Sequence, residues 1–549
     1  MSSDGETAAK VVIGISFGNS YSSVANTSDE GKAQVIANEE GIPSILSYVE
    51  GEEFQGTQAK AQLVRNPQNT VAYFRDYLGK DFKSIDPTPS HASAHPTEHS
   101  SAVAFHINDT ESEDKNTVTV SDIVTRHLRR LKQSASDFIG QQVTAAVITI
   151  PTNFSDAQKS ALTESAQAAG LDVLQYIHEP VSALLAYDAR QTDEPVKDKT
   201  VVVADLGGIR SDVAVVASRG GMYTILATAH DYDLGGAQLD QVLIDYAAKE
   251  FMKKNKTDPR QNERSLAKLK LEAEASLADG VDFSLSVNRT RYELLANKTF
   301  ASFTRLIEGV VQKAGLDVLD IDEIILSGGT SHTPKIARNL QSHFPDSTTV
   351  LAPATSPTAI NPSELSARGA AIQASLIAEF DKEDIEQSTE AVVTVTPHLS
   401  KAIGVVVGSD EFQPIILPET AVPVRRTAQI AAPKDGGDVL VRLCEGLSEI
   451  NVTKPEPKAK PETNGNRDED DDEDDEDESE EEEEDLREKV WKTGPVLAEA
   501  GVKGVKKGGK VEVQVSVGAD LAVQVIVREI GAKGGVRGSI EAVTENGSA

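Results

Sequence analysis

The chain has 549 residues, 39% of them hydrophobic, and a formal net charge of −33 at pH 7. A chain of this length is expected to form several domains, each with a sizeable core. The negative charge argues against direct binding to nucleic acid or to anionic membranes, because both carry negative charge themselves.

Residues 1–10 at the N-terminus are polar and contain no apolar signal core. No window approaches the roughly 18 apolar residues that a membrane span needs. The single cysteine, Cys444, excludes an intramolecular disulfide framework and a cysteine-rich zinc site. We therefore expect a soluble cytoplasmic protein without a membrane partner.

Apolar strands that end in glycine turns recur along residues 10–380. The first strand begins at Val11 and leads into Gly18, Asn19, Ser20 and Tyr21. Glycine turns allow backbone N–H groups to approach a phosphate closely. The same residues also fit an ordinary tight turn, so one such motif carries little weight.

Two further strands end in the same way, and their recurrence favours a nucleotide site over ordinary turns. The run Val201–Ala204 leads into Asp205, Leu206, Gly207 and Gly208, where the carboxylate could hold a hydrated Mg²⁺. The run Ile324–Ser327 leads into Gly328, Gly329 and Thr330, and a further pair, Gly235 and Gly236, lies between these motifs. Two strand–turn units on one nucleotide predict a duplicated fold.

Helical patterns alternate with these strands and indicate an α/β architecture. We predict helices over 155–169, 262–278 and 363–378, the last with Ser363 as its N-cap. His91, His95 and His99 have a spacing that would suit metal ligands on a helix, but three neighbouring prolines favour a surface loop. No metal site is predicted there.

The remaining residues have a β-rich pattern after an acidic linker at 381–395. Short apolar segments at 391–395, 402–407, 412–417, 439–443, 511–517 and 521–527 predict a small antiparallel β-domain over 396–549. The insertion 454–488 contains 17 acidic residues among the 18 positions 468–485. Because it cannot bury apolar area, we expect a disordered loop or a solvated charged helix. No helical segment is predicted after the last strand.

In this order, the motifs resemble the seventy-kilodalton heat-shock (Hsp70) chaperones over nearly the whole chain. The residues that carry the resemblance are Gly14–Ser22, Val147–Pro151, Glu179–Pro180, Asp205–Gly208, Leu234–Gly236, Gly328–Gly329, Asn361–Pro362 and Arg368–Ala371. The resemblance implies an α/β actin-like duplicated nucleotide-binding domain (10–380), a linker, and an antiparallel β-sandwich. The helical lid that covers the sandwich in the family is not predicted here.

The resemblance also implies residue roles in an ATP site, and several positions depart from the family pattern. Ser16 stands where the family has an acidic residue, Arg75 where it has a lysine, and Arg210 where it has a threonine. Glu179 and Asp205 keep their carboxylates. Gly18, Asn19, Ser20, Tyr21, Arg75, Gly207, Gly208, Gly235, Gly236, Glu274, Gly328, Gly329 and Thr330 are the predicted nucleotide-binding residues.

These departures predict a pseudo-ATPase that binds ATP with little or no hydrolysis. Hydrolysis needs positioned water, a held Mg²⁺ and correctly aimed positive charge. Arginine is planar and bulkier than lysine, so the change at Arg75 is not conservative. Arg210 places a further cation beside the expected phosphates, and the use of Mg²⁺ stays open. The Glu272 and Glu274 carboxylates fit either an adenosine contact or a solvated helix face.

Within the family, the departures are similar to those of the atypical fungal branch that pairs with the J-protein zuotin. The resemblance implies a stable heterodimer with such a J-protein, ribosome association through that partner, and a co-chaperone role toward a conventional chaperone of the family. The strand edge at 392–395 could accept a partner segment or pair within the chain. The acidic run fits a solubilising insertion, a clasp for a basic partner segment, or a phosphorylation site at Ser479.

Two other function classes fit parts of the pattern. An active peptide-binding chaperone ATPase would use the same domains, but Ser16, Arg75, Arg210 and the absent lid oppose it. A sugar-kinase-like phosphotransferase would share the duplicated fold but leaves the β-domain without a role.

Overall fold

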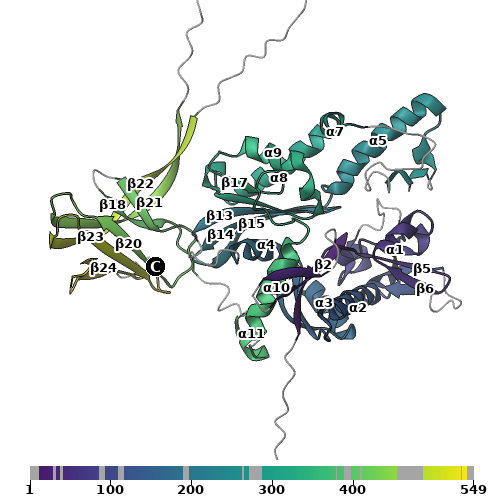
Figure 1. Ribbon diagram of the computed structural model, residues 1–549, viewed down its shortest axis with the longest axis horizontal. Helices are drawn as coiled ribbons and strands as arrows, with labels where there is room; N and C mark the ends of the chain where they lie inside the picture. Colours follow the sequence, from purple (N-terminus) through teal and green to yellow (C-terminus); the bar gives the residue numbers. More distant parts are fainter. Residues whose placement is uncertain are drawn as a thin grey trace, which may run out of the picture. The chain divides into compact units, whose positions relative to one another are not determined.

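The chain forms two compact units, Met1–Val395 and Thr396–Ala549, in the computed structural model. The first combines sheets with helices, and the second consists mainly of strands (Figure 1). The structure describes residues 11–28, 32–36, 41–85, 93–108, 117–189, 197–262, 265–266, 268–270, 287–378, 380–388, 397–407, 411–453, 486–532 and 534–540.

The first large sheet of the first unit has the strand order β12-β11-β1-β2-β3. Its strands are β1 (Val12–Phe17), β2 (Tyr21–Thr27), β3 (Ala33–Ile36), β11 (Ala145–Ile150) and β12 (Asp172–His178), and the short β4 (Ile42–Pro43) pairs with β2. β1 is antiparallel to β2 and parallel to β11. Ile13 and Ile15 on β1 are fully buried, as expected of a central strand.

The second large sheet repeats this topology with the order β15-β14-β13-β16-β17. Its strands are β13 (Lys199–Leu206), β14 (Ser211–Arg219), β15 (Met222–Asp231), β16 (Glu323–Ser327) and β17 (Thr349–Leu351). β13 is antiparallel to β14 and parallel to β16, as β1 is to β2 and β11. We call residues 12–178 the first half of this unit and residues 199–351 the second half; their matching sheets agree with the predicted duplication.

Two helices join the halves. α4 (Glu179–Asp188) and α10 (Leu365–Ile377) pack against each other between the large sheets (Figure 1). Glycine permits the closest approaches: a Cβ atom on Gly369 would lie 1.8 Å from the carbonyl oxygen of Ser182. A Cβ atom on Gly14 of β1 would lie 2.1 Å from the backbone nitrogen of Ala371. The join therefore depends on backbone contact that any side chain would disturb.

The first unit contains further helices in its described part, several of which pack on its sheets. They are α1 (Thr57–Lys60), α2 (Val120–Ile139), α3 (Asp156–Ala168), α5 (Gly236–Asn255), α7 (Arg289–Leu295), α8 (Asn297–Lys313), α9 (Pro334–His343) and α11 (Lys382–Ser388). Ser155 caps α3 by a capping box with Gln158, and Gly170 follows its end with φ 75°, so the predicted helix over 155–169 is confirmed. Among the described residues, none of the helices combines the length and apolar composition needed to cross a membrane.

Small three-stranded sheets complete the first unit. One has the order β6-β5-β7, with β5 (Ile45–Val49), β6 (Glu52–Gln55) and β7 (Thr70–Ala72). The other has the order β10-β9-β8, with β8 (Pro96–His99), β9 (Ala102–His106) and β10 (Thr117–Thr119). His99 therefore lies on a strand, which corrects the predicted loop at that position; Pro96 begins the strand, where a missing N–H is tolerated. His91 lies outside the described residues.

The second unit is a sandwich of two four-stranded sheets in its described part. One sheet has the order β19-β18-β21-β22, with β18 (Ala402–Val407), β19 (Glu411–Ile416), β21 (Gly437–Thr453) and β22 (Leu486–Val505). The other has the order β20-β23-β24-β25, with β20 (Val424–Ala431), β23 (Lys510–Val517), β24 (Val523–Glu529) and β25 (Val536–Ile540). Val405 and Leu443 share a buried core with Val513 and Val525 across the sheets.

Three sequence predictions are corrected by this fold. Residues 382–388 of the predicted linker form α11, because Ile385 is buried in a cluster with Val147 and Ile377. α10 begins at Leu365, and Ser363 is not its N-cap, because the Ser363 backbone N–H bonds to Asn361 Oδ1 within the preceding turn. The acidic insertion ends earlier than predicted, since β22 starts at Leu486.

Other predictions fall outside the described residues. They concern most of the helix over 262–278, including Glu274, together with the strand at 391–395 and the acidic run at 468–485.

Candidate functional site

Two predicted glycine turns meet at the ends of the central strands. Gly18, Asn19 and Ser20 connect β1 to β2, while Gly207 and Gly208 lie between β13 and β14. A Cβ atom on Gly208 would lie 2.7 Å from Ser20 Oγ, so the two turns are in contact. The duplicated topology therefore brings one turn from each half to a shared position.

The remaining glycine motifs surround the turn of the second half. The backbone N–H of Gly236, at the start of α5, donates to the carbonyl oxygen of Gly207, and Thr330 Oγ1 donates to the same oxygen at 2.8 Å. Gly328 has φ 83°, and a Cβ atom there would lie 2.5 Å from Asp205 Oδ1. The structure thus gathers most of the predicted nucleotide-binding residues of this half around Asp205 and Gly207.

The other predicted site residues, Tyr21, Gly329 and Ser16, are less central to the contact between the two glycine turns. The Tyr21 hydroxyl accepts from Lys60 Nζ at 2.5 Å, and Gly329 begins a short 3₁₀ turn, Gly329–His332. Ser16 pairs with Thr149 in the register of β1 and β11, and Thr149 Oγ1 is buried without a hydrogen-bond partner within the described structure. Ser16 itself supplies a hydroxyl in place of a carboxylate, beside the hydroxyl of Thr149.

Arg75 is buried and hydrogen-bonded to several protein groups. Its Nη1 donates to Glu179 Oε1 and to the carbonyl oxygen of Phe17, each at 3.1 Å, and its Nε donates to Asp76 Oδ1 at 2.9 Å. Its backbone N–H donates to Asn19 Oδ1 at 3.0 Å. The side chain is only 5% exposed, so this guanidinium is held among buried carboxyl groups.

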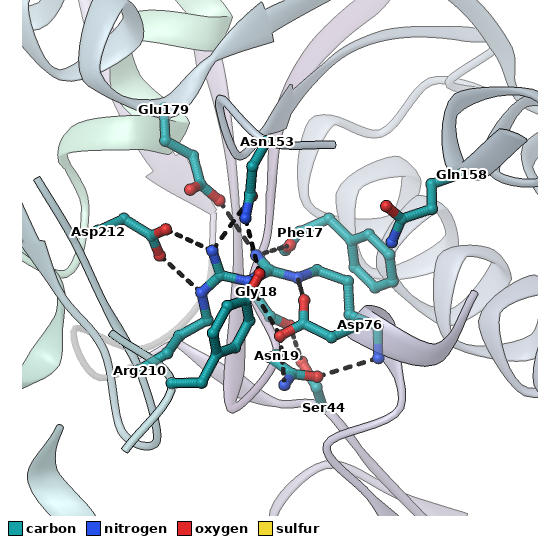
Figure 2. Close-up of polar contacts among 12 residues, drawn as sticks. Phe17, Gly18, Asn19, Ser44, Asp76, Asn153, Gln158, Glu179, Arg210 and Asp212 are labelled. Atoms are coloured by element: carbon teal, nitrogen blue, oxygen red, sulfur yellow. Dashed lines mark hydrogen bonds and ion pairs between the residues drawn. The ribbon is translucent and has the colours of Figure 1, made fainter. Parts of the chain in front are cut away.

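Arg210 is also held by carboxylates. Its Nη1 donates to Asp76 Oδ2 at 3.1 Å, and its Nε and Nη2 bind both oxygens of Asp212. Figure 2 shows Asp212 and Glu179 on one side of this cluster and Asp76 on the other. Neighbouring carboxylates thus balance the charge of Arg210, as they do that of Arg75, and the predicted contacts of these two cations with phosphate stay predictions.

The carboxyl groups of the cluster differ in the direction in which their pKa values are shifted. Burial acts to raise the pKa of Asp76, but the charges of Arg75 and Arg210 outweigh burial and hold this pKa below its ordinary value. Burial raises the pKa of Glu179 to about 8, against the opposing charge of Arg75. Burial, reinforced by the charge of Asp212, raises the pKa of Asp205 to about 6. Glu179, Asp205 and Asp212 line one small pocket.

Stability of the first unit should therefore depend on Glu179 between about pH 5 and 8. Folded Glu179 keeps a proton up to about pH 8, whereas the unfolded side chain releases it near pH 4.5, so the free energy of unfolding should fall as pH rises through this range. Glu179→Gln should reduce this slope, as measured by denaturant unfolding of the full chain at several pH values. An unchanged slope in the variant would contradict the assignment.

Sequence reasoning missed several partners in this cluster. Asp76 follows Arg75 directly and Asp212 lies two residues after Arg210, so proximity in the sequence could have identified both. Asn153 and Tyr232 also join the cluster, and His230 Nδ1 lies 2.6 Å from Asp212 Oδ1. No local pattern indicates these three, because the fold brings them together from separate loops and strands.

Comparison with known proteins gives a consistent assignment. The Hsp70 protein family model matches residues 12–452. The ribosome-associated complex subunit SSZ1 of Saccharomyces cerevisiae is 43% identical over 96% of this chain and 99% of its own length. A heat shock protein 70 homolog of Schizosaccharomyces pombe is 45% identical over 81% of this chain and 82% of its own length.

A more distant relative extends the comparison beyond fungi. Human heat shock 70 kDa protein 14 is 32% identical over 79% of this chain and 87% of its own length. The family match covers both the glycine turns and the first strands of the sandwich. This chain therefore belongs to the Hsp70 family, as its motifs predicted.

Proposed function

We propose that this protein is an ATP-binding, hydrolysis-deficient chaperone-like subunit that forms a stable complex with a zuotin-like J-protein at cytoplasmic ribosomes. In this role it acts as a co-chaperone for a conventional Hsp70 ATPase that folds nascent chains. The observation that carries the proposal is the buried pairing of Arg75 and Arg210 with Glu179, Asp76 and Asp212.

ATP binding is supported by the backbone of the site. Glycine turns from both halves meet beside the N-terminus of α5, where backbone N–H groups and the helix dipole favour an anion. The residues that would hold phosphate are Gly18, Ser20, Gly207, Gly208, Gly235, Gly236, Gly328, Gly329 and Thr330. Bound ATP would supply a reactive phosphoanhydride. Some donors of these residues bind protein groups, namely the backbone N–H groups of Gly207, Gly235, Gly236 and Gly328 and the Thr330 hydroxyl. We propose that the other main-chain donors and the Ser20 hydroxyl hold the phosphates.

Loss of hydrolysis is supported by the side chains. A carboxylate that orients the attacking water and accepts its proton acts in the ionised form. Here Glu179 Oε1 accepts from Arg75, and the raised pKa favours the protonated form of Glu179. Ser16 supplies no charge for a hydrated Mg²⁺, and in the described ranges no group of three or more His, Cys, Asp or Glu residues is placed to hold a metal.

The partner assignment rests on similarity. The relative from Saccharomyces cerevisiae is named as a subunit of a ribosome-associated complex, and the two chains align over almost their whole lengths. We propose that residues 10–380 bind nucleotide and that the sandwich of residues 396–549 serves as a docking surface. The division at Val395 and the strands of the second unit support these limits.

A turnover assay separates this proposal from an active peptide-binding chaperone. We expect steady-state phosphate release from the purified chain to stay at background, both alone and with a zuotin-like J-protein. A conventional Hsp70 assayed with a J-protein provides the positive control. Stimulation of this chain by the J-protein to a comparable rate would reject the pseudo-ATPase proposal.

Pull-down experiments test the partner. We expect the tagged full chain to retain the J-protein through repeated washes and to sediment with ribosomes only when that J-protein is present. Equal ribosome binding without the J-protein would contradict association through the partner.

A further inference from the structure

We infer that Arg210, Tyr232, Asp76 and Asn153 form an interlobe latch that closes the two halves of the first unit with protein groups alone. The inference concerns closure of this unit and holds whether or not ATP is hydrolysed. It assigns a conformational role to Arg210.

The contacts of the latch cross from one half to the other. Arg210 lies at the start of β14 in the second half, and its Nη1 and Nη2 donate to Asp76 Oδ2 and Asn153 Oδ1 of the first half at 3.1 and 3.4 Å. Asn153 Nδ2 in turn donates to the hydroxyl of Tyr232, in the second half, at 2.7 Å. The Arg210 guanidinium also lies 4.5 Å from the centre of the Tyr232 ring.

Burial makes the ionic part of the latch strong. The Arg210 side chain is 7% exposed and the Asp76 side chain 15%, so water screens their attraction weakly. Asp212 binds the same guanidinium from within the second half through both carboxylate oxygens. Arg210 is therefore already oriented by its own half, and less side-chain entropy is lost when it binds Asp76.

The packing around the latch explains why these contacts control closure. One large core cluster is built from residues between Ile13 and Leu171, and another from residues between Val202 and Ala352, so each half has its own core. α4 and α10 supply an apolar join between the sheets, which can act as a hinge. At the glycine turns, the described contacts between the halves are polar or backbone contacts. Opening there would break the latch without disturbing either core.

A substitution at Tyr232 should weaken the latch without removing its ionic contacts. Its side chain is exposed, and Tyr232→Phe removes only the hydroxyl that accepts from Asn153. Tyr223→Phe is the matched control, because the hydroxyl of Tyr223 binds Asp188 Oδ2 at 2.8 Å on the side of the second sheet where α4 packs. Arg210→Thr removes the whole ionic connection.

Distance measurement by electron paramagnetic resonance tests the inference in the full chain freed of nucleotide. Spin labels are attached at Gln58→Cys on α1 and Asn255→Cys on α5, both exposed positions, in a background in which the buried Cys444 is replaced by alanine. The protein with an unaltered latch should give one narrow distribution of short distances between the two spin labels. Arg210→Thr should add a longer population, with an open-to-closed ratio raised on the order of a hundredfold.

If Arg210→Thr fails to fold, the two tyrosine variants still test the inference. Tyr232→Phe should raise the open-to-closed ratio on the order of fivefold, while Tyr223→Phe should match the parent protein. Distributions for Tyr232→Phe and Tyr223→Phe that both equal the parent's would overturn the inference, as would a parent that is open without nucleotide. Because no ATP is present, this result is independent of the turnover assay.

Discussion

Replacing Gly369 by alanine should destabilise the first unit by about 3 kcal/mol or more. The added Cβ atom would lie 1.8 Å from the Ser182 carbonyl oxygen and 2.5 Å from its carbonyl carbon, both in the backbone of α4. α4 and α10 would have to move apart, and they form the apolar join between the two halves. Thermal and denaturant unfolding of the full chain would measure the loss.

Gly309 provides a matched control for this prediction. It also lies inside a helix, α8, but a Cβ atom there would meet nothing within 4 Å. Gly309→Ala should therefore stabilise the unit by about 0.5–1 kcal/mol through helix propensity. Equal effects at Gly309 and Gly369 would show that the helices do not approach as closely as described.

Arg75→Ala should cost about 3–5 kcal/mol, the second large effect. The variant leaves the Asp76 and Glu179 carboxyl groups without the guanidinium that binds them both, and it removes the donor to the Phe17 carbonyl oxygen. Arg75→Lys should lose less, because it keeps the charge but cannot reproduce the planar fork. Unfolding of the full chain by denaturant gives both values.

An exposed ion pair provides the comparison for Arg75. The Arg289 side chain is 52% exposed and pairs with Glu293 one turn along α7, so Arg289→Ala should cost about 0.5 kcal/mol or less. A loss at Arg75 no larger than that at Arg289 would mean that the buried cluster is not paired as described.

Local sequence signals predicted much of the fold. Asp156 in the first turn and Gly170 after the end predicted α3, and the apolar run at 402–407 matches β18 residue for residue. Such elements depend on neighbours in the sequence. β20 and β22 were missed because their alternation is interrupted by arginines, lysines and glycines, and their pairing partners are distant in the chain.

The candidate site also divides into features that the sequence predicted and features that only the fold shows. The glycine turns and the departures at Ser16, Arg75 and Arg210 were visible in the sequence. What Arg210 does was not visible, because its charge is balanced by Asp76, 134 positions away, and by Asp212. Only the fold shows that Arg210 contacts the other half through Asp76 and Asn153.

The most direct test of the central claim is a single-turnover experiment with the full chain in excess over γ-labelled ATP. We predict that gel filtration recovers intact ATP on the protein and that labelled phosphate appears no faster than in buffer. Rapid release of labelled phosphate, or protein that retains no ATP, would contradict the account.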